Sequence, residues 1–279
     1  MSTALGWKQV RPSLLCALGV AAAALYLFPV YWMYISGMKT SAEIFSIPPT
    51  FIPRAPSLNS FKAVLERENV LRYLVNSFVI AGGTTALTLV LASGTAYALA
   101  RVRSKWLDVA LIAIMVSQVL PPALLATPMF VIFRQFGLLN SHLGVVLAVT
   151  TKTLPFAIVM LRTSFAQIPI ELEEAARVDG ASRVGAFFRV VLPLARIGFI
   201  VVGTIVFLLA YGEFVYPVSL LSKGSLQPAT VGLYGFVGAD YADWPNAMAF
   251  ASIIVTPVIV LFLVLQRQIV AGLTAGALK

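Results

Sequence analysis

The sequence predicts an all-α polytopic membrane protein with six transmembrane helices, and three observations support this fold class. Charged residues make up 11% of the 279 residues and hydrophobic residues 59%, whereas a soluble domain has about twice that charged share. The mean hydropathy is +0.92. Six apolar stretches are long enough to cross a hydrocarbon core, which takes about 20 helical residues. They must be helices, because a lone strand would leave its peptide groups unsatisfied in lipid.

The transmembrane domain is expected to cover 13–267, between an N-terminal end at 1–12 and a tail at 268–279. Lys8, Arg11, the apolar run after them and "AAAA" are also typical of a signal peptide. The run continues through "LYLFPVYWMYISGM", which is too long for a cleaved signal, so a retained first helix is favoured. The spans are placed at about 13–36, 73–100, 107–133, 142–161, 196–221 and 247–266.

The third span contains three prolines, in "LPPALLATP" at 120–128. Proline removes a backbone donor and kinks or breaks a helix. A kinked or broken helix is therefore expected there, and such helices often border a transport cavity.

The distribution of positive charge predicts the topology, because basic residues gather in cytoplasmic loops. If the N-terminus is cytoplasmic, the short outer loops hold Arg134 and Lys223 and little else. Both termini and the segment 169–195 are then cytoplasmic, and the net charge of +9 reflects topology, with no nucleic-acid partner implied. The inner segments hold twelve of the 20 basic residues: Lys8, Arg11, Arg101, Arg103, Lys105, Arg162, Arg177, Arg183, Arg189, Arg196, Arg267 and Lys279.

Enzymatic and metal sites find no support in the residue types. Cys16 and His142 are the single cysteine and histidine, which excludes a disulfide within the chain, a cysteine metal cluster and a His-rich site. His142, at a span boundary, is expected to lie on the surface or cap a helix. No H-E-x-x-H, no G-x-S-x-G and no paired acids occur in the spans, so no catalytic residue is assigned. A phosphate loop is also missing, because the nearest dipeptide, Lys152-Thr153, lies within a span.

The segment 169–195 is polar and basic although apolar spans flank it. Pro169 suits a helix start, and the glutamates that follow favour a helix N-terminus. Glu173 and Arg177 form a favourable i,i+4 pair. Gly180 breaks the run as a turn residue. A short helix is therefore expected before Gly180.

A second short helix is expected after this glycine. Ser182 is suited to cap it, and Leu192 and Pro193 end it. The apolar ridge that results needs a partner: the bilayer, the protein's own helices, or a groove in another protein. The residues alone leave these three alternatives open. Apolar residues recur at i, i+3, i+4 and i+7, namely Val184, Phe187, Phe188 and Val191.

This segment resembles the EAA loop of ABC importer permeases. The family pattern is matched by Glu174-Ala175-Ala176, by Gly180, by Val190 in place of the usual isoleucine, and by Leu192-Pro193. Three further stretches are similar to carbohydrate-type, maltose-permease-like members: "NSFVIAGGTTALTLVLASGTAYALARVR" at 76–103, "YGEFVYPVSLL" at 211–221 and the end "QRQIVAGLTAGALK". Tyr211-Gly212 departs from the usual Trp-Asn.

The resemblance implies a permease subunit of the bacterial cytoplasmic membrane that imports a carbohydrate by alternating access. Its expected partners are a second homologous permease chain, two ATPase subunits that hold ATP and Mg, an extracytoplasmic substrate-binding protein and the lipid bilayer. This chain itself would bind no cofactor and would not be an enzyme.

The resemblance also implies that the EAA loop is the coupling helix, seated in a groove of one ATPase subunit. Acidic residues would anchor it, Gly180 would permit the bend, and the two phenylalanines would supply apolar contact. Packing of the phenylalanines on the permease's own helices is the alternative. The residues assigned to ATPase coupling are Glu174, Ala175, Ala176, Asp179, Gly180, Phe187, Phe188, Leu192 and Pro193.

Polar residues inside the spans mark the expected substrate path, because ionisable groups at membrane depth usually face a cavity or a partner. Glu213 is the clearest candidate, and Tyr211 and Tyr216 offer a hydroxyl and an apolar face. Gln118 and Asn76 are further candidates, for which hydrogen bonding between helices is the alternative use. For Glu213 the alternative is a structural hydrogen bond to the partner permease.

An ion-coupled secondary carrier is the competing function. It would need ion or proton sites within the membrane, and only Glu213 and Lys152 qualify. Lys152 is expected to pair with an acidic group or to extend toward the interface.

Overall fold

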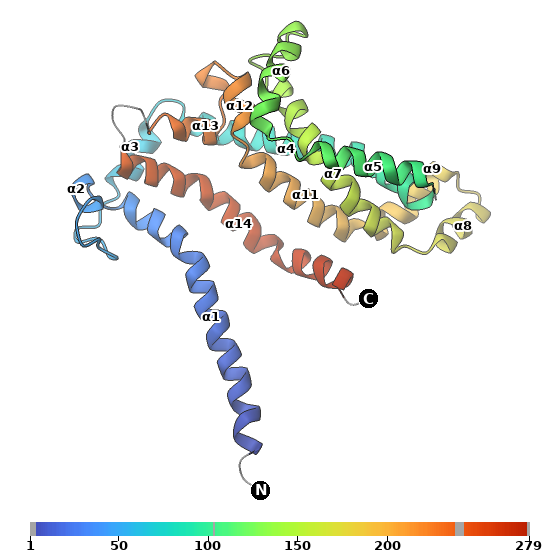
Figure 1. The fold of residues 1–279 in the computed structure, drawn as a ribbon, viewed down its shortest axis with the longest axis horizontal. Helices are drawn as coiled ribbons and strands as arrows, with labels where there is room; N and C mark the ends of the chain where they lie inside the picture. Colours follow the sequence, from blue (N-terminus) through green and yellow to red (C-terminus); the bar gives the residue numbers. More distant parts are fainter. Residues whose placement is uncertain (1–3, 103, 238–242, 278–279) are drawn as a thin grey trace. The chain divides into compact units, whose positions relative to one another are not determined.

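The computed structural model describes residues 4–102, 104–237 and 243–277, and every regular element within these ranges is helical (Figure 1). The predicted all-α class is therefore confirmed. Contacts divide the chain into two compact units. One comprises Met1–Arg67 and Leu233–Thr256, and the other comprises Glu68–Gly232 and Pro257–Lys279.

The first unit joins α1 (Ala4–Gly37) to the beginning of α14 (Trp244–Ala277). The Tyr34 hydroxyl lies 2.7 Å from Thr256 Oγ1 and donates to the Ser252 carbonyl at 3.3 Å. A Cβ at Gly37 would come within 3.0 Å of the Ala249 backbone. The close approach of these two helices therefore depends on glycine at position 37.

One carboxylate organises the segment between α1 and α3 (Asn59–Glu66). Glu43 lies in the short helix α2 (Ser41–Ile44) and accepts from the Arg54 backbone N–H at 2.8 Å and from the Thr50 hydroxyl at 2.9 Å. The Arg54 N–H, supported by the Thr50 hydroxyl, holds the pKa of Glu43 below its ordinary value. The ionised carboxylate thus ties α2 to the chain that follows it.

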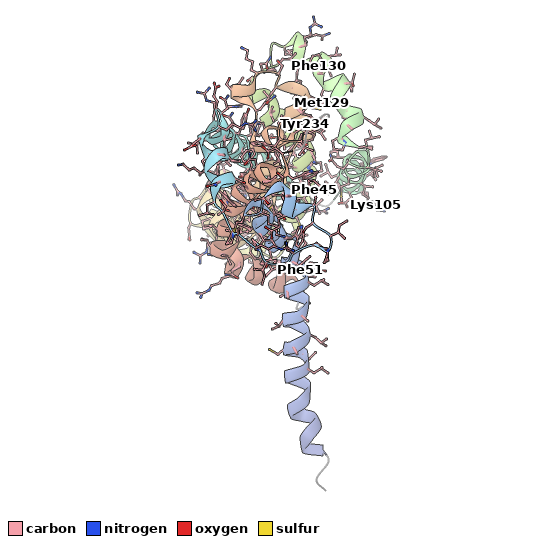
Figure 2. The ribbon with its side chains drawn as sticks, turned by 90° about the vertical axis from the view of Figure 1, so that its left-hand side faces the viewer. Phe45, Phe51, Lys105, Met129, Phe130 and Tyr234 are labelled. Atoms are coloured by element: carbon pink, nitrogen blue, oxygen red, sulfur yellow. The ribbon has the colours of Figure 1, made fainter. Side chains whose placement is uncertain are left out.

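The apolar side chains of α1 from Leu14 to Phe28 are exposed, and Figure 2 shows side chains standing out on both sides of this helix. Leu25 and Tyr26 are 73% and 83% exposed.

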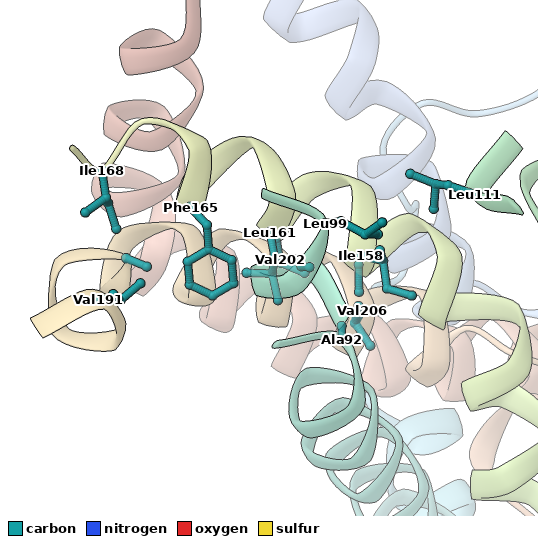
Figure 3. Packing of buried hydrophobic residues seen from close by; sticks show 13 residues of the cluster. Ala92, Leu99, Leu111, Ile158, Leu161, Phe165, Ile168, Val191, Val202 and Val206 are labelled. Atoms are coloured by element: carbon teal, nitrogen blue, oxygen red, sulfur yellow. The ribbon is translucent and has the colours of Figure 1, made fainter. Parts of the chain in front are cut away.

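The second unit has three long helices at its centre, α4 (Val70–Arg101), α7 (His142–Ala166) and α11 (Arg196–Tyr211) (Figure 1). Their buried faces carry small residues such as Ala92, Ala96 and Ala157, which let the helices approach closely. Larger side chains, among them Leu161 and Phe165, fill the remaining space. Figure 3 shows this cluster along α7.

The contacts fix the directions of these helices. Val146 on α7 lies 3.1 Å from where a Cβ of Gly83 on α4 would be, and further along both helices the hydroxyls of Thr88 and Thr153 are 2.8 Å apart. The helices α4 and α7 therefore run in the same direction. Tyr211, at the end of α11, packs on Phe78 near the beginning of α4, so α11 runs the opposite way.

The expected third span is broken. α5 (Lys105–Ser117) ends before Gln118, and α6 (Pro122–Gln135) begins after Pro121. Pro121 and Pro122 have no backbone N–H, so they cannot continue the hydrogen bonding of α5. The break predicted from "LPPALLATP" is therefore present. Figure 2 labels Lys105 at the start of α5 and Met129 and Phe130 in the second half of α6.

Short elements follow α11: α12 (Val215–Leu220), η2 (Gly224–Leu226), a 3₁₀ turn, and α13 (Ala229–Tyr234). Side chains from the beginnings of α4 and α7 hold the loop around η2. Asn76 donates to the carbonyls of Ser225 and Gln227 at 2.9 Å each. His142 Nε2 bonds the Leu226 carbonyl at 3.0 Å, so it holds the loop, whereas the neighbouring Ser141 caps α7. This loop is thus an ordered continuation of the helix bundle.

The span count differs from the expected six. By length and composition, four helices in the described part of the chain can cross a membrane: Leu14–Gly37, Val70–Arg101, His142–Ala166 and Trp244–Gln268. A fifth is counted if Arg183–Leu194 and Arg196–Tyr211, bent by 75°, form one span. The expected spans 107–133 and 196–221 are both divided into shorter helices, which is why they fall short individually.

Residues 1–3, 103, 238–242 and 278–279 lie outside the described residues, and these include Arg103 and Lys279 of the topology argument. The tail predicted at 268–279 has a helical backbone as far as Ala277.

Candidate functional site

The first half of the segment 169–195 forms the expected short helix. α8 (Ile170–Val178) starts after Pro169 and ends at Asp179. Gly180 has φ +91°, its N–H donates to the Arg177 carbonyl at 3.1 Å, and the Ala181 N–H donates to the Ala176 carbonyl at 2.9 Å. These two bonds form a Schellman cap, which needs a left-handed residue at this position. The predicted turn at Gly180 is therefore present.

The second half is more irregular than expected. Ser182 caps α9 (Arg183–Ala186) by accepting from the Gly185 N–H at 3.0 Å, as predicted. A π-helical turn, η1 (Phe187–Val191), and α10 (Leu192–Leu194) follow. Pro193 has no N–H to continue the α-helical pattern, which accounts for the wider turn before it. The helix bends at Ala195 and not at Leu192-Pro193, so the predicted end was early by two residues.

The π turn divides the predicted apolar ridge between two faces. Phe187 packs on Tyr97 of α4 with ring centroids 4.8 Å apart, and Val191 is fully buried in the core cluster. Val184 and Phe188 are 66% and 59% exposed. A π turn adds a residue per turn, so the i, i+3, i+4, i+7 spacing no longer keeps four side chains together. Of the two phenylalanines, Phe187 thus packs on the protein's own helices, whereas Phe188 is exposed and available to a partner.

The carboxylate of Glu173 points into the bundle. Glu173 is 6% exposed and accepts from the Tyr97 hydroxyl and from Arg101 Nε, each at 2.6 Å, and also from Arg101 Nη2. The same guanidinium donates to the carbonyls of Phe165 and Ile168 at 3.2 Å. The predicted Glu173–Arg177 pair was wrong, because Arg101 offers a buried guanidinium that donates twice to Glu173 Oε1, whereas Arg177 is exposed.

The opposite face of the segment is exposed. Glu174, Ala175, Asp179, Gly180 and Phe188 all lie on it. Among the other predicted coupling residues Pro193 is exposed, whereas Ala176, Phe187 and Leu192 are partly covered. The segment therefore has an inner face fixed to α4 and α7 and an outer face with acidic and apolar side chains that a second protein can contact.

A second polar cluster lies at the break between α5 and α6. Lys152 on α7 donates to Glu213 Oε2 at 2.6 Å, and Glu213 Oε1 accepts from the Val215 N–H at 3.0 Å. Glu213 is 4% exposed, so the carboxylate is covered while the Lys152 side chain is about a third exposed. The expected acidic partner of Lys152 is therefore Glu213.

A cavity of about 320 Å³ lies beside this ion pair. Gln118, Thr151, Lys152 and Tyr216 supply its polar groups, and leucine and proline side chains of the α5–α6 break supply the apolar wall. Gln118 Nε2 also donates to the Thr151 carbonyl at 3.4 Å. Hydroxyl and ammonium donors on an apolar wall are typical of a site for a small polar solute.

Two predicted path residues are elsewhere. Asn76 uses its amide on the carbonyls of the η2 loop, which is a structural role. Tyr211 packs between Phe78 and Phe207, with ring centroids 5.4 Å and 5.9 Å away. Among the five predicted path residues, Gln118 and Tyr216 line the cavity, and Glu213 reaches it through Lys152.

Sequence reasoning missed Tyr97 and Arg101 as parts of the site. Both lie in the last turns of α4, where Arg101 was counted only as a topological charge. The four-residue spacing of Tyr97 and Arg101, which places both side chains on one helix face, was a usable signal. Their acidic partner could not be predicted from the neighbouring sequence, because Glu173 is 72 residues from Arg101.

Comparisons with known proteins agree with this architecture. The chain is 36% identical over 253 residues to the sulfoquinovosyl glycerol transport system permease protein SmoH of Agrobacterium fabrum, covering 91% of this chain and 89% of that protein. It is 33% identical to the diacetylchitobiose uptake system permease protein DasC of Streptomyces coelicolor, covering 93% and 95%.

Among solved structures, a bacterial ABC transporter involved in import of the acidic polysaccharide alginate contains a chain of the same fold. Its TM-score is 0.77 at 20% identity, covering 93% of this chain and 96% of that one. Residues 89–274, which include the whole segment 169–195 and the Lys152–Glu213 pair, match the family model of binding-protein-dependent transport system inner membrane components. The chain belongs to this family and is a permease subunit of a binding-protein-dependent importer.

Proposed function

We propose that this permease imports a carbohydrate or a sugar derivative, with energy from ATP that partner subunits hydrolyse. The observation that carries the proposal is the likeness, over about nine tenths of the chain, to permease proteins named for sulfoquinovosyl glycerol and diacetylchitobiose transport. Both solutes contain sugars with many hydroxyls. The donors around the 320 Å³ cavity, Gln118, Lys152 and Tyr216, suit such hydroxyls.

In this proposal the protein lies in the bacterial cytoplasmic membrane with six spans and both termini in the cytoplasm. The third span consists of α5 and α6, and the fifth consists of α11 with α12. The break in each lies near the cavity, which supports the proposal because irregular backbone at membrane depth is tolerated where it lines a polar cavity.

The segment 169–195 is the coupling element. Its outer face, with Glu174, Asp179, Val184 and Phe188, contacts one of two ATPase subunits, which bind ATP and Mg. Acidic side chains and exposed apolar groups on one face of a short helix are suited to a groove in another protein. A second, homologous permease chain provides the other coupling element, and a substrate-binding protein delivers the solute from outside.

The mechanism is alternating access. ATP binding draws the ATPase subunits together, α8 follows the subunit that it contacts, and the attached helices change the side to which the cavity opens. In this chain the Lys152 ammonium donates to solute hydroxyls, and Gln118 and Tyr216 both donate to and accept from them. The Lys152–Glu213 ion pair keeps the cavity electrically neutral.

Reconstitution tests the proposal. The chain is assembled in proteoliposomes with candidate partners, namely a second permease, an ATPase and a substrate-binding protein. Uptake is measured for three radiolabelled sugars after which related permeases are named: diacetylchitobiose, trehalose and sulfoquinovosyl glycerol. Uptake of at least one sugar that requires both MgATP and the binding protein is expected. Uptake by this chain alone, without ATP, would instead establish an ion-coupled carrier, for which Glu213 and Lys152 are the ionisable groups.

A further inference from the structure

We propose that Arg101 and Glu173 form the mechanical joint through which movement of the coupling segment enters the helix bundle, with Arg101 as the positioning residue. This inference rests on the proposed function of segment 169–195. It goes further because it names the contact, on the inner face of the segment, that turns a movement of α8 into a movement of α4 and α7.

The geometry of the ion pair supports a rigid connection. Arg101 Nε and Nη2 both donate to Glu173 Oε1, and the Tyr97 hydroxyl donates to Oε2, so both carboxylate oxygens are held. Charge-assisted hydrogen bonds to both oxygens restrict the orientation of the carboxylate as well as its distance. The Arg101 and Glu173 side chains are 14% and 8% exposed, so water does not compete freely for these bonds.

The same guanidinium also holds the end of α7. Its Nη1 and Nη2 groups donate to the carbonyls of Phe165 and Ile168, each at 3.2 Å. These carbonyls belong to the last turn of α7 and to the residues just after it, where helix carbonyls have no partner within the helix. A single arginine of α4 therefore connects α8 with the end of α7.

Tyr97 connects the second half of the segment to the same point. Its hydroxyl donates to Glu173 Oε2 at 2.6 Å, and its ring packs on Phe187 of η1 at 4.8 Å and on Phe165 at 6.0 Å. Figure 3 shows Val191 and Ile168 beside Phe165 at this end of the core. Both halves of the segment thus meet α4 within one helical turn.

The apolar contacts and the ion pair have separable roles. Phe187 and Val191 bury apolar surface, which holds the segment in place without fixing its orientation. The charged joint fixes the orientation of α8. Glu173→Gln keeps the size of the side chain but removes the charge that Arg101 binds, so the chain is expected to remain folded while the joint loosens.

The test uses the complete reconstituted transporter with MgATP and the same three radiolabelled sugars. Glu173→Gln is expected to keep the ATPase subunits bound and MgATP hydrolysis within about twofold of wild type, and to lower uptake at least tenfold, so that more ATP is hydrolysed per sugar imported. Unchanged uptake, or uptake and hydrolysis that fall in proportion, would overturn the inference, because a merely structural role predicts proportional losses.

A second ion pair on α7 supplies the control. Arg162 donates to Asp108 Oδ1 at 2.8 Å and joins α7 to α5 without involving a residue of segment 169–195, and it is more exposed than the Arg101–Glu173 pair. Asp108→Asn is expected to leave the ratio of ATP to sugar unchanged. Equal uncoupling by both variants would refute a specific role for the Arg101–Glu173 joint. If the wild-type complex shows no ATP-dependent uptake, the proposed function itself fails, a result that differs from failure of the joint alone.

A reversible cross-link tests the joint independently of folding. After Cys16→Ser removes the single cysteine, Arg101→Cys and Glu173→Cys are combined. A short bis-methanethiosulfonate cross-linker then bridges the two positions through disulfide bonds, which a thiol reductant cleaves. Uptake per ATP should rise at least fivefold on cross-linking and fall again on reduction. A cross-linked transporter whose uptake per ATP stays at the uncoupled level would overturn the inference.

Discussion

Gly180 offers the sharpest test of the bend in segment 169–195. Its φ of +91° is a conformation that side chains rarely adopt, but a Cβ there would meet nothing within 4 Å. A substitution therefore strains the backbone without creating a clash. For an ordinary residue the left-handed conformation costs about 1–2 kcal/mol, whereas asparagine tolerates it better and β-branched residues tolerate it worst.

This backbone strain lowers the population of the bent form of the segment. A penalty of about 1.4 kcal/mol lowers the ratio of bent to straightened segment about tenfold. We expect sugar uptake to fall in the order Gly180→Asn, Gly180→Ala, Gly180→Val, with Asn close to wild type and Val nearly inactive. The amount of chain in the membrane should stay within twofold in all three, because no core contact changes.

The assay is ATP-dependent uptake in the reconstituted transporter, together with a membrane immunoblot. Gly137 provides the control, because it has φ +68° and also nothing within 4 Å, but lies between α6 and α7. Gly137→Val carries a similar strain outside the segment and should retain most uptake. Normal uptake in Gly180→Val, or equal loss in Gly180→Asn and Gly180→Val, would refute the argument, since neither result follows from backbone strain at the bend.

Three other predictions follow from single contacts. Lys152→Met leaves the covered carboxylate of Glu213 without its cation and should lower the free energy of unfolding by about 3 kcal/mol, and Glu213→Leu added to it should restore most of the loss in thermal unfolding. Gly232→Ala places a Cβ 2.4 Å from the Tyr73 ring and should destabilise the protein by about 1–3 kcal/mol; an unchanged melting temperature would contradict that packing. Because the pKa of Glu43 is lowered in the folded protein, its stabilising bonds are present above the ordinary glutamate pKa and are lost as pH falls through the lowered value. The amide protection factors in 40–54, which correct for the intrinsic exchange rate at each pH, should therefore fall on acidification in wild type but not in Glu43→Gln.

Much of the fold was predictable because two of its determinants can be read from short stretches of sequence. A long apolar run forms a helix that suits lipid, and a proline interrupts a helix. The long apolar runs around Val90 and Val149 gave helices α4 and α7, and the prolines at 121 and 122 gave the break between α5 and α6. The two-part form of segment 169–195 was predictable from Gly180 and Ser182. Gly180 ends the first helix through its backbone, and Ser182 caps the second helix through its side chain.

The missed features depend on residues that are distant in the sequence. Glu173 had a plausible partner four residues away in Arg177, and only the packing of α8 against the end of α4 makes Arg101 the better one. The π turn in η1 could not be read from spacing, because an α-helical period was assumed throughout. The η2 loop is likewise fixed by Asn76 and His142, whose partners are backbone carbonyls that leave no signature in residue type.

The interruption between α5 and α6 has a consequence for solvent. Where a helix stops and another begins, up to four carbonyls and four N–H groups have no partner within either helix. Hydrocarbon cannot satisfy them, and the 320 Å³ cavity beside Gln118 is the space from which water can. The cavity at this break is therefore expected to hold water. A solute that follows the proposed path would exchange part of its hydration shell for this water and for the polar side chains of the cavity.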